Sequence, residues 1–182
     1  MDENAINARM QKTLDSLKKA LTKIRTGVAT PAMLDNIMVD YYGTMTPINH
    51  AANVTIPEPR CLLIQPFEKN MLEVIEKAIH SSDLGLPPNN DGKSIRLTLP
   101  VLTTERREEL AKKVRGTGED AKIGIRNIRR DENENLKAEA KKESHSEDVT
   151  KNLKDKIQSL TDDYIKRIDD IVAEKEKDIM NV

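Results

Sequence analysis

The sequence predicts an α+β protein, in which a long three-helix bundle is interrupted by a small inserted β/α/β domain. Segments near both ends of the chain carry apolar residues at heptad spacing, whereas the segment between them has the shorter period of strands. Aromatic residues make up 2% of the chain and charged residues 34%, which is typical of helices that pack through aliphatic stripes. Three such stripes need one another, because an isolated helix cannot bury its own.

The first helix is expected over about residues 3 to 28, where apolar residues recur at steps of three and four. This stripe consists of Ile6, Met10, Leu14, Leu17, Leu21, Ile24 and Val28. Gly27 and Pro31 are expected to end the helix, since proline disfavours helix at the residue before it and cannot continue the hydrogen-bond ladder.

The inserted domain is expected over residues 31–102. Its predicted strands are short and lie at 36–41, 44–48, 54–56, 61–65 and 94–99. The first two flank a turn at Gly43, a helix over 69–80 covers one face of the sheet, and 86–92 is a turn-rich loop.

The helical pattern returns after Pro100, with Thr104 as the expected N-cap. One helix is predicted through three glycines, because its apolar stripe keeps its phase across them: Leu110, Val114, Thr117, Ala121, Ile125 and Ile128. A last helix, capped by Ser146, repeats the theme with Val149, Leu153, Ile157, Leu160, Tyr164, Ile168 and Ile171. The bundle domain is therefore 1–29 with 104–182, and the hinge lies at 29–31 and 100–104.

Charge is unevenly spread, although 30 Lys and Arg nearly balance 31 Asp and Glu. Residues 1–30 and 104–143 have a basic excess, and the other two segments are net acidic. On the second predicted long helix, a basic stripe lies beside the apolar one and contains Arg115, Lys122, Arg126, Arg129 and Lys137. Arginine suits phosphate oxygens, so the stripe indicates a polyanionic partner. An ordinary solvated helix face remains an alternative.

Catalytic and targeting patterns do not appear. His50, His80 and His145 lie far apart, and no metal-ligand spacing or glycine-rich phosphate loop is present. We therefore expect neither an enzyme nor a cofactor. The longest apolar runs are too short to span a bilayer, and the start of the chain has no signal-peptide pattern, which predicts a soluble, cytoplasmic protein. The lone Cys61 is expected to be a small buried residue.

Several short motifs together resemble the ribosome recycling factor family, in order along essentially the whole chain. They are Lys23–Gly27, Val39–Thr44 followed by Thr46–Pro47, Glu58–Arg60, Ser82–Leu86, Thr104–Arg107, Ile125–Arg130 and Ser146–Asp148. The resemblance implies an L-shaped, monomeric two-domain protein. It also implies binding to the large subunit of the post-termination ribosome and, with elongation factor G and GTP, separation of the subunits and release of mRNA and tRNA.

The resemblance also implies site residues. Bundle arginines of the family contact ribosomal RNA, and the matching residues here are Arg126, Arg129 and Arg130, to which the basic stripe adds Arg115 and Lys122. Arg106, Arg107 and Arg25 are candidate contacts to RNA or the hinge. The hinge residues are Thr30, Pro31, Val101, Leu102 and Thr103.

Two other classes of function remain as alternatives. A helical scaffold could use its basic face to bind an acidic protein. A hydrolase of nucleotides or peptidyl-tRNA is disfavoured by the missing catalytic set.

Overall fold

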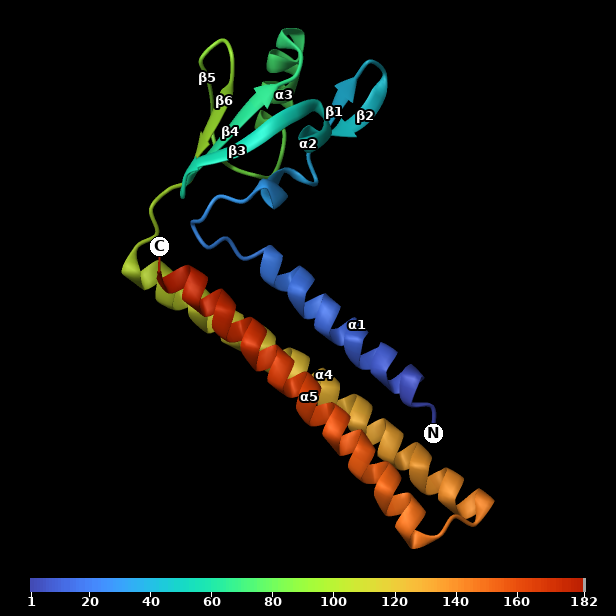
Figure 1. Cartoon of the computed structure of the whole chain (residues 1–182). Coiled ribbons are helices and arrows are strands. Elements are labelled where there is room, and N and C mark those ends of the chain that lie inside the picture. Colours follow the sequence, from blue (N-terminus) through green and yellow to red (C-terminus); the bar gives the residue numbers. More distant parts are fainter. Residues whose placement is uncertain (182) are drawn as a thin grey trace. The chain divides into compact units, whose positions relative to one another are not determined.

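The computed structural model describes residues 1–181, which divide into two compact units. Unit 1 consists of Met1–Thr26 and Thr103–Asn181, and unit 2 of Gly27–Leu102. Within the described chain, the strands all lie in unit 2 and the three long helices in unit 1 (Figure 1). The predicted α+β fold class is confirmed.

Unit 1 is a bundle of α1 (Glu3–Thr22), α4 (Thr104–Glu143) and α5 (Glu147–Met180). Helices α4 and α5 form a long hairpin, and its turn extends beyond the N-terminus of α1 (Figure 1). Each helix begins at a side-chain cap: Asp2, Thr103 and Ser146 accept hydrogen bonds from the backbone N–H groups of Ala5, Arg106 and Val149.

The predicted helix bounds need two corrections. Helix α1 ends at Thr22, not near residue 28. Gly27 has a φ of 79°, which is incompatible with a right-handed helix that continues to residue 28. Ile24 is nevertheless buried, so the apolar pattern outlasts the helix that it was used to predict. The N-cap of α4 is Thr103 rather than Thr104. The continuity of α4 through its glycines and the cap at Ser146 are confirmed.

The bundle core contains the predicted stripes with a few exchanges. On α4, Gly118 is buried in place of the predicted Thr117, which is only half-buried. On α5, Val149 lies in the first turn of the helix and is 45% exposed. Thr161 is buried instead, and its hydroxyl donates to the Ile157 carbonyl at 2.8 Å.

Two of the three α4 glycines have a packing reason. A Cβ added at Gly118 would lie 2.5 Å from Val172 Cγ2 on α5, and one at Gly124 would lie 3.2 Å from Thr13 Cγ2 on α1. These glycines let neighbouring helices approach closely. A Cβ at Gly116 would meet nothing within 4 Å.

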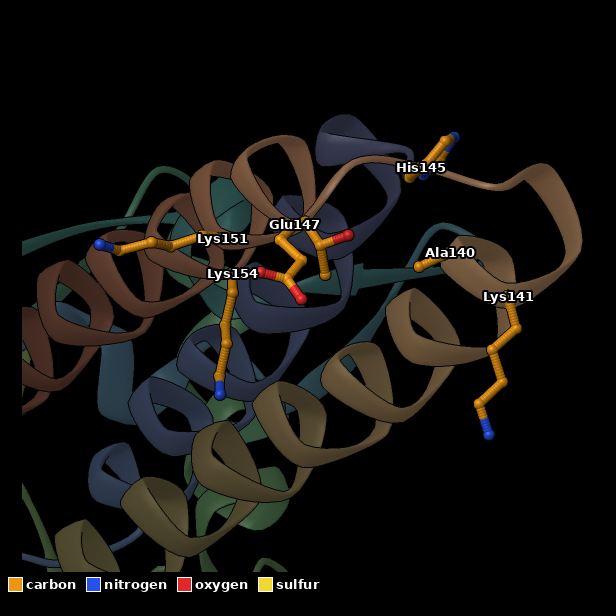
Figure 2. A pocket seen from close by; sticks show the side chains of 7 residues that line it. Ala140, Lys141, His145, Glu147, Lys151 and Lys154 are labelled. Atoms are coloured by element: carbon orange, nitrogen blue, oxygen red, sulfur yellow. The ribbon is translucent and has the colours of Figure 1, made fainter.

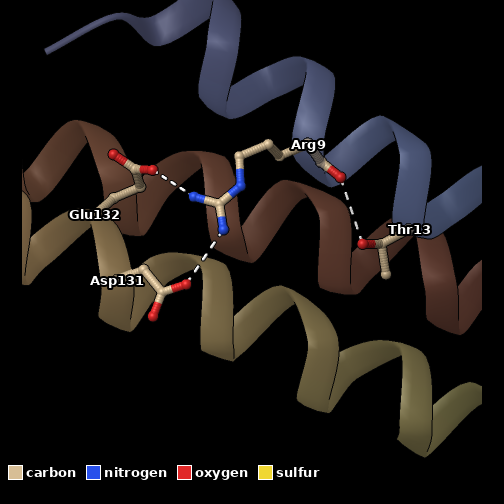
Figure 3. A network of polar contacts seen from close by, with 4 residues as sticks. All are labelled: Arg9, Thr13, Asp131 and Glu132. Atoms are coloured by element: carbon tan, nitrogen blue, oxygen red, sulfur yellow. Dashed lines mark hydrogen bonds and ion pairs between the residues drawn. The ribbon is translucent and has the colours of Figure 1, made fainter.

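Polar contacts join α1 to the hairpin. Arg9 forms ion pairs with Glu132 at 2.6 Å and Asp131 at 3.2 Å (Figure 3). The hydroxyl of the buried Tyr164 on α5 donates a hydrogen bond to Asn7 Oδ1.

Three basic residues at seven-residue intervals join α4 to α5. Arg115 pairs with Glu176 at 3.1 Å, Lys122 pairs with Asp169, and Arg129 Nη1 donates to Gln158 Oε1 at 3.2 Å. We call Arg115, Lys122 and Arg129 the hairpin cations. The hydrogen bond to Asp169 raises the pKa of the Lys122 ammonium, although burial of the side chain opposes this rise.

Unit 2 combines a two-stranded and a four-stranded antiparallel sheet. Strands β1 (Met38–Tyr41) and β2 (Thr44–Pro47) form the first, and Gly43, with a φ of 85°, lies in their turn. The second has the order β3-β4-β6-β5, with β3 (Ala52–Glu58), β4 (Cys61–Pro66), β5 (Pro88–Asn90) and β6 (Ile95–Thr98).

Helical turns surround the sheets: η1 (Pro31–Leu34), α2 (Ile48–Ala51), η2 (Lys69–Met71) and α3 (Leu72–His80). Leu72, Ile75 and Ile79 of α3 share one core with Leu62 and Ile64 of β4. The predicted loop at 86–92 is wrong in part, because Pro88–Asn90 forms an edge strand paired with β6. Proline is tolerated at an edge, where its missing N–H breaks no ladder.

Gly118→Ala should destabilise unit 1 by about 1–2 kcal/mol, because overpacking against Val172 outweighs the higher helix propensity of alanine. Urea denaturation measures this loss. Adding Val172→Ala should restore most of it by removing the clashing methyl group. A single variant as stable as the parent would contradict the close helix contact.

Lys122→Gln should lower the free energy of unfolding by on the order of 1 kcal/mol near neutral pH. The pKa of Lys122 is raised on folding, so this stabilisation is complete below the unfolded pKa of about 10.4 and is lost as the pH rises through the higher folded pKa. Denaturation at about pH 7 and pH 11 should show the gap between parent and variant narrowing. The exposed Lys166, changed to Gln, is the matched control and should show no gap.

Candidate nucleic-acid interface

One face of α4 points away from both neighbouring helices. It consists of exposed residues on the side opposite the apolar stripe, and we call it the outer face: Lys112, Gly116, Glu119, Ile123, Arg126, Arg130, Glu134 and Lys137. Four of these are basic, and Glu119 and Glu134 are acidic. The carboxylate of Glu119 accepts a hydrogen bond from Lys122 at 3.2 Å, so its charge is already partly neutralised.

Arg126 and Arg130 are the predicted site residues that remain available. Both are exposed, and they lie one helical turn apart. Within residues 1–181 neither has an ion pair or a side-chain hydrogen bond. Each guanidinium therefore keeps its donors for a ligand, and the planar fork of arginine suits bidentate contact with a phosphate.

The hairpin cations lie beside the apolar stripe, as the helical projection predicts, but they already have partners on α5. Arg129 is half-buried and donates to Gln158 on α5. The side chain of Lys122 is 15% exposed and contacts two carboxylates. These residues lie at the border between α4 and α5, and therefore contribute to the bundle whatever else they bind.

The three arginines outside the stripe differ from one another. Arg106 is exposed and pairs with Glu109 one turn later at 2.9 Å. Arg107 is half-buried and donates to the Met180 carbonyl at 3.5 Å, and its Nε has no partner within the described residues. Arg107 therefore caps the C-terminal end of α5. Arg25 is exposed beyond the end of α1.

A pocket of about 460 Å³ lies at the turn end of the hairpin (Figure 2). Lys141, Lys151 and Lys154 contribute to its lining, together with Glu147. Figure 2 shows the three ammonium groups pointing in different directions rather than toward one centre. The pocket therefore adds positive charge to this end of the bundle without forming a built anion site.

Other candidate chemistry is not assembled in the described part of the chain. No group of three or more His, Cys, Asp or Glu side chains in residues 1–181 could hold a metal ion. None of the described helices is long and apolar enough to cross a membrane. Cys61 is buried, as predicted, with Arg96 Nη1 3.4 Å from its sulfur atom.

Sequence reasoning did not single out several members of the outer face, among them Lys112, Gly116 and Ile123. Ile123 is 52% exposed. A helical projection of the sequence places it opposite the apolar stripe, so its exposure could have been predicted. Gly116 gave no such signal, because the open space beside it is visible only in the folded bundle.

Known proteins resemble this chain along nearly its whole length. The family model "Ribosome recycling factor" matches residues 17–180. The ribosome-recycling factor of Syntrophomonas wolfei is 55% identical and covers 96% of this chain and 94% of its own. That of Leptospira biflexa is 52% identical over the same shares, and that of Gloeothece citriformis is 48% identical over the full length of both chains.

Solved structures show the same relationship. A solution structure of a ribosome recycling factor has a TM-score of 0.80 at 37% identity, covering 97% of this chain and 94% of that one. The second is the T. thermophilus recycling factor, described with E. coli elongation factor G bound to the E. coli post-termination complex. It has a TM-score of 0.66 at 43% identity, covering 97% and 96% of the two chains. With the family model and half-identical full-length relatives in agreement, this chain belongs to the ribosome recycling factor family, whose members are translation factors and not enzymes.

Proposed function

We propose that this chain acts on the post-termination ribosome. It binds the large subunit and, with elongation factor G and GTP, separates the subunits and frees mRNA and tRNA for a new round of translation. The observation that carries this proposal is full-length similarity to recycling factors, one of them described with elongation factor G on a post-termination complex. The chain acts as a monomer in the cytoplasm, where its ribosomal target lies.

The RNA contact in this proposal is centred on Arg126 and Arg130. Their unpaired guanidinium groups and the basic outer face support contact with phosphates of ribosomal RNA. Helix α4 carries no aromatic side chain for stacking on bases, so the contact is mainly electrostatic. Secondary roles in this contact fall to the hairpin cations, Arg106 and Arg107, because each of them also has a partner within unit 1. Arg25, which is exposed beyond the end of α1, is a further secondary candidate.

The proposed hinge uses the two segments at 29–31 and 100–104, which join domain 31–102 to the bundle. Its residues are Thr30, Pro31, Val101, Leu102 and Thr103. Ala29 N–H donates to the Pro59 carbonyl and Leu99 N–H donates to the Arg60 carbonyl, each at 2.8 Å. Both linker segments are thus tied by hydrogen bonds to the same turn, at the adjacent residues Pro59 and Arg60. This common attachment supports a limited bend of the domain rather than free tumbling.

Arg126→Ala and Arg130→Ala should each weaken binding to large ribosomal subunits by about 1–3 kcal/mol, because a charge-assisted hydrogen bond is lost. Each lost phosphate contact should also lower the slope of log affinity against log salt by about one. Co-sedimentation at several salt concentrations measures both effects. The stability of these variants should stay within about ±0.5 kcal/mol of the parent.

Two controls separate this contact from other causes. Lys166→Ala removes an exposed cation from α5 and should leave binding unchanged. Ile128→Ala should cost about 2–5 kcal/mol of stability by opening a cavity in the core. If the arginine variants bound as well as the parent, the site assignment would be wrong.

Inserting two glycines after Thr30 should leave ribosome binding nearly intact and slow subunit splitting severalfold, because motion driven by elongation factor G would no longer reach the bundle. Light scattering follows splitting. Val101→Ala is the control. It keeps the length of its linker, and because the Val101 side chain is 65% exposed, this variant is expected to split subunits normally. Normal splitting by the insertion variant would contradict the proposal that the hinge transmits this motion to the bundle.

A further inference from the structure

The fold of this chain gives no reason for Gly116. A glycine inside a helix lowers its stability relative to alanine. Gly118 and Gly124 are explained by close contacts with Val172 and Thr13, but a side chain at position 116 would enter open space. Position 116 therefore gives up helix stability for no contact within the described chain.

Ile123 is unusual on the same face. Residues seven apart on an α-helix share a face, so Gly116, Ile123 and Arg130 form one row along about 21 Å of α4. Ile123 is 52% exposed among charged neighbours. A single exposed apolar residue is common, but this one lies between a bare stretch of backbone and two unpaired arginines.

The charge of this row limits what can cover it. Arg126 and Arg130 are exposed cations one and two turns beyond Ile123. Of the exposed acids near them, Glu119 is bonded to Lys122, whereas Asp120 and Glu134 have no ion pair within residues 1–181. A covering surface must therefore be anionic where it meets the two arginines, must offer an apolar edge to Ile123, and must be narrow enough to touch the helix backbone at Gly116. An RNA sugar-phosphate backbone has these properties, with phosphates for arginine and the carbon face of ribose for isoleucine.

We propose that an RNA strand runs along the outer face from Arg130 to Gly116, with its phosphates at Arg126 and Arg130 and a ribose against Ile123. The missing side chain at Gly116 lets the strand approach the helix backbone. This inference rests on the proposed function and extends its RNA contact by about three turns toward the N-terminus of α4.

Substitutions at position 116 test the inference because stability and binding should change in opposite directions. Gly116→Ala should raise the thermal midpoint by about 2–4 °C, since a Cβ there meets nothing in the chain. It should nevertheless weaken binding to salt-washed large ribosomal subunits. Gly116→Leu, with a bulkier side chain in the contact, should weaken it by about tenfold or more.

Ile123→Ala is the second variant and should weaken binding without lowering the thermal midpoint. Two matched changes on α5 are the controls. Ser159→Ala raises helix propensity at an exposed site, and Val149→Ala removes a 45%-exposed apolar side chain. Both controls should bind subunits like the parent.

Hydroxyl-radical cleavage of the RNA in the complex identifies the covering surface, because these radicals attack ribose. The parent should protect a short run of riboses, and Gly116→Leu should lose part of that protection. If Gly116→Leu bound like the parent, or if it lost affinity while ribose protection stayed complete, the inference would be overturned. Loss of binding by the Arg126 and Arg130 variants alone would then leave the proposed RNA contact standing, whereas unchanged binding by all variants would remove both the inference and the RNA contact assigned to Arg126 and Arg130.

Discussion

The bundle depends on burial of three apolar stripes that no helix can bury alone. Helix α1 contributes Ile6, Met10 and Leu14 to a core whose other sides come from α4 and α5, after the whole of unit 2 has intervened in the sequence. Closing so long a loop costs entropy. Unit 2 reduces this cost when folded, because hydrogen bonds from Ala29 and Leu99 to adjacent carbonyls hold the two ends of the insertion beside one turn.

The same packing divides the basic residues of α4, those of the stripe together with Arg130, into two groups with different roles. Arg115, Lys122 and Arg129 lie at the border with α5, where acidic or amide side chains meet them. Arg126 and Arg130 lie farther around the helix and meet no partner in the described chain. A stripe that is uniform in sequence thus becomes a seam within the bundle and a separate outward face, and only the second is free to bind an anion without breaking an existing contact.

Periodicity predicted most of the fold because burial repeats with the helix. It kept α4 continuous across Gly116, Gly118 and Gly124, since the packing of the stripe outweighs the low helix propensity of these residues. It failed where a local contact decides the outcome. Helix α1 ends before its apolar pattern does, and Pro88–Asn90 becomes a strand because β6 offers it a partner. For the site, the basic stripe indicated Arg126 and the family resemblance indicated Arg130, but which cations are already paired depends on how α4 and α5 pack against each other.

Length and rigidity of α4 make its outer face usable. Three glycines together cost a helix roughly 2–3 kcal/mol relative to alanine, more than an isolated helix of this composition could bear. Helix α4 tolerates them because its apolar stripe is buried against two neighbours and the hairpin cations fasten it to α5. The outward side chains are therefore not needed for folding. The buried side of α4 fixes the position of the outer face, so the residues of that face can be selected for their fit to a partner. A precise contact with a rigid partner such as RNA requires a surface that is fixed in this way.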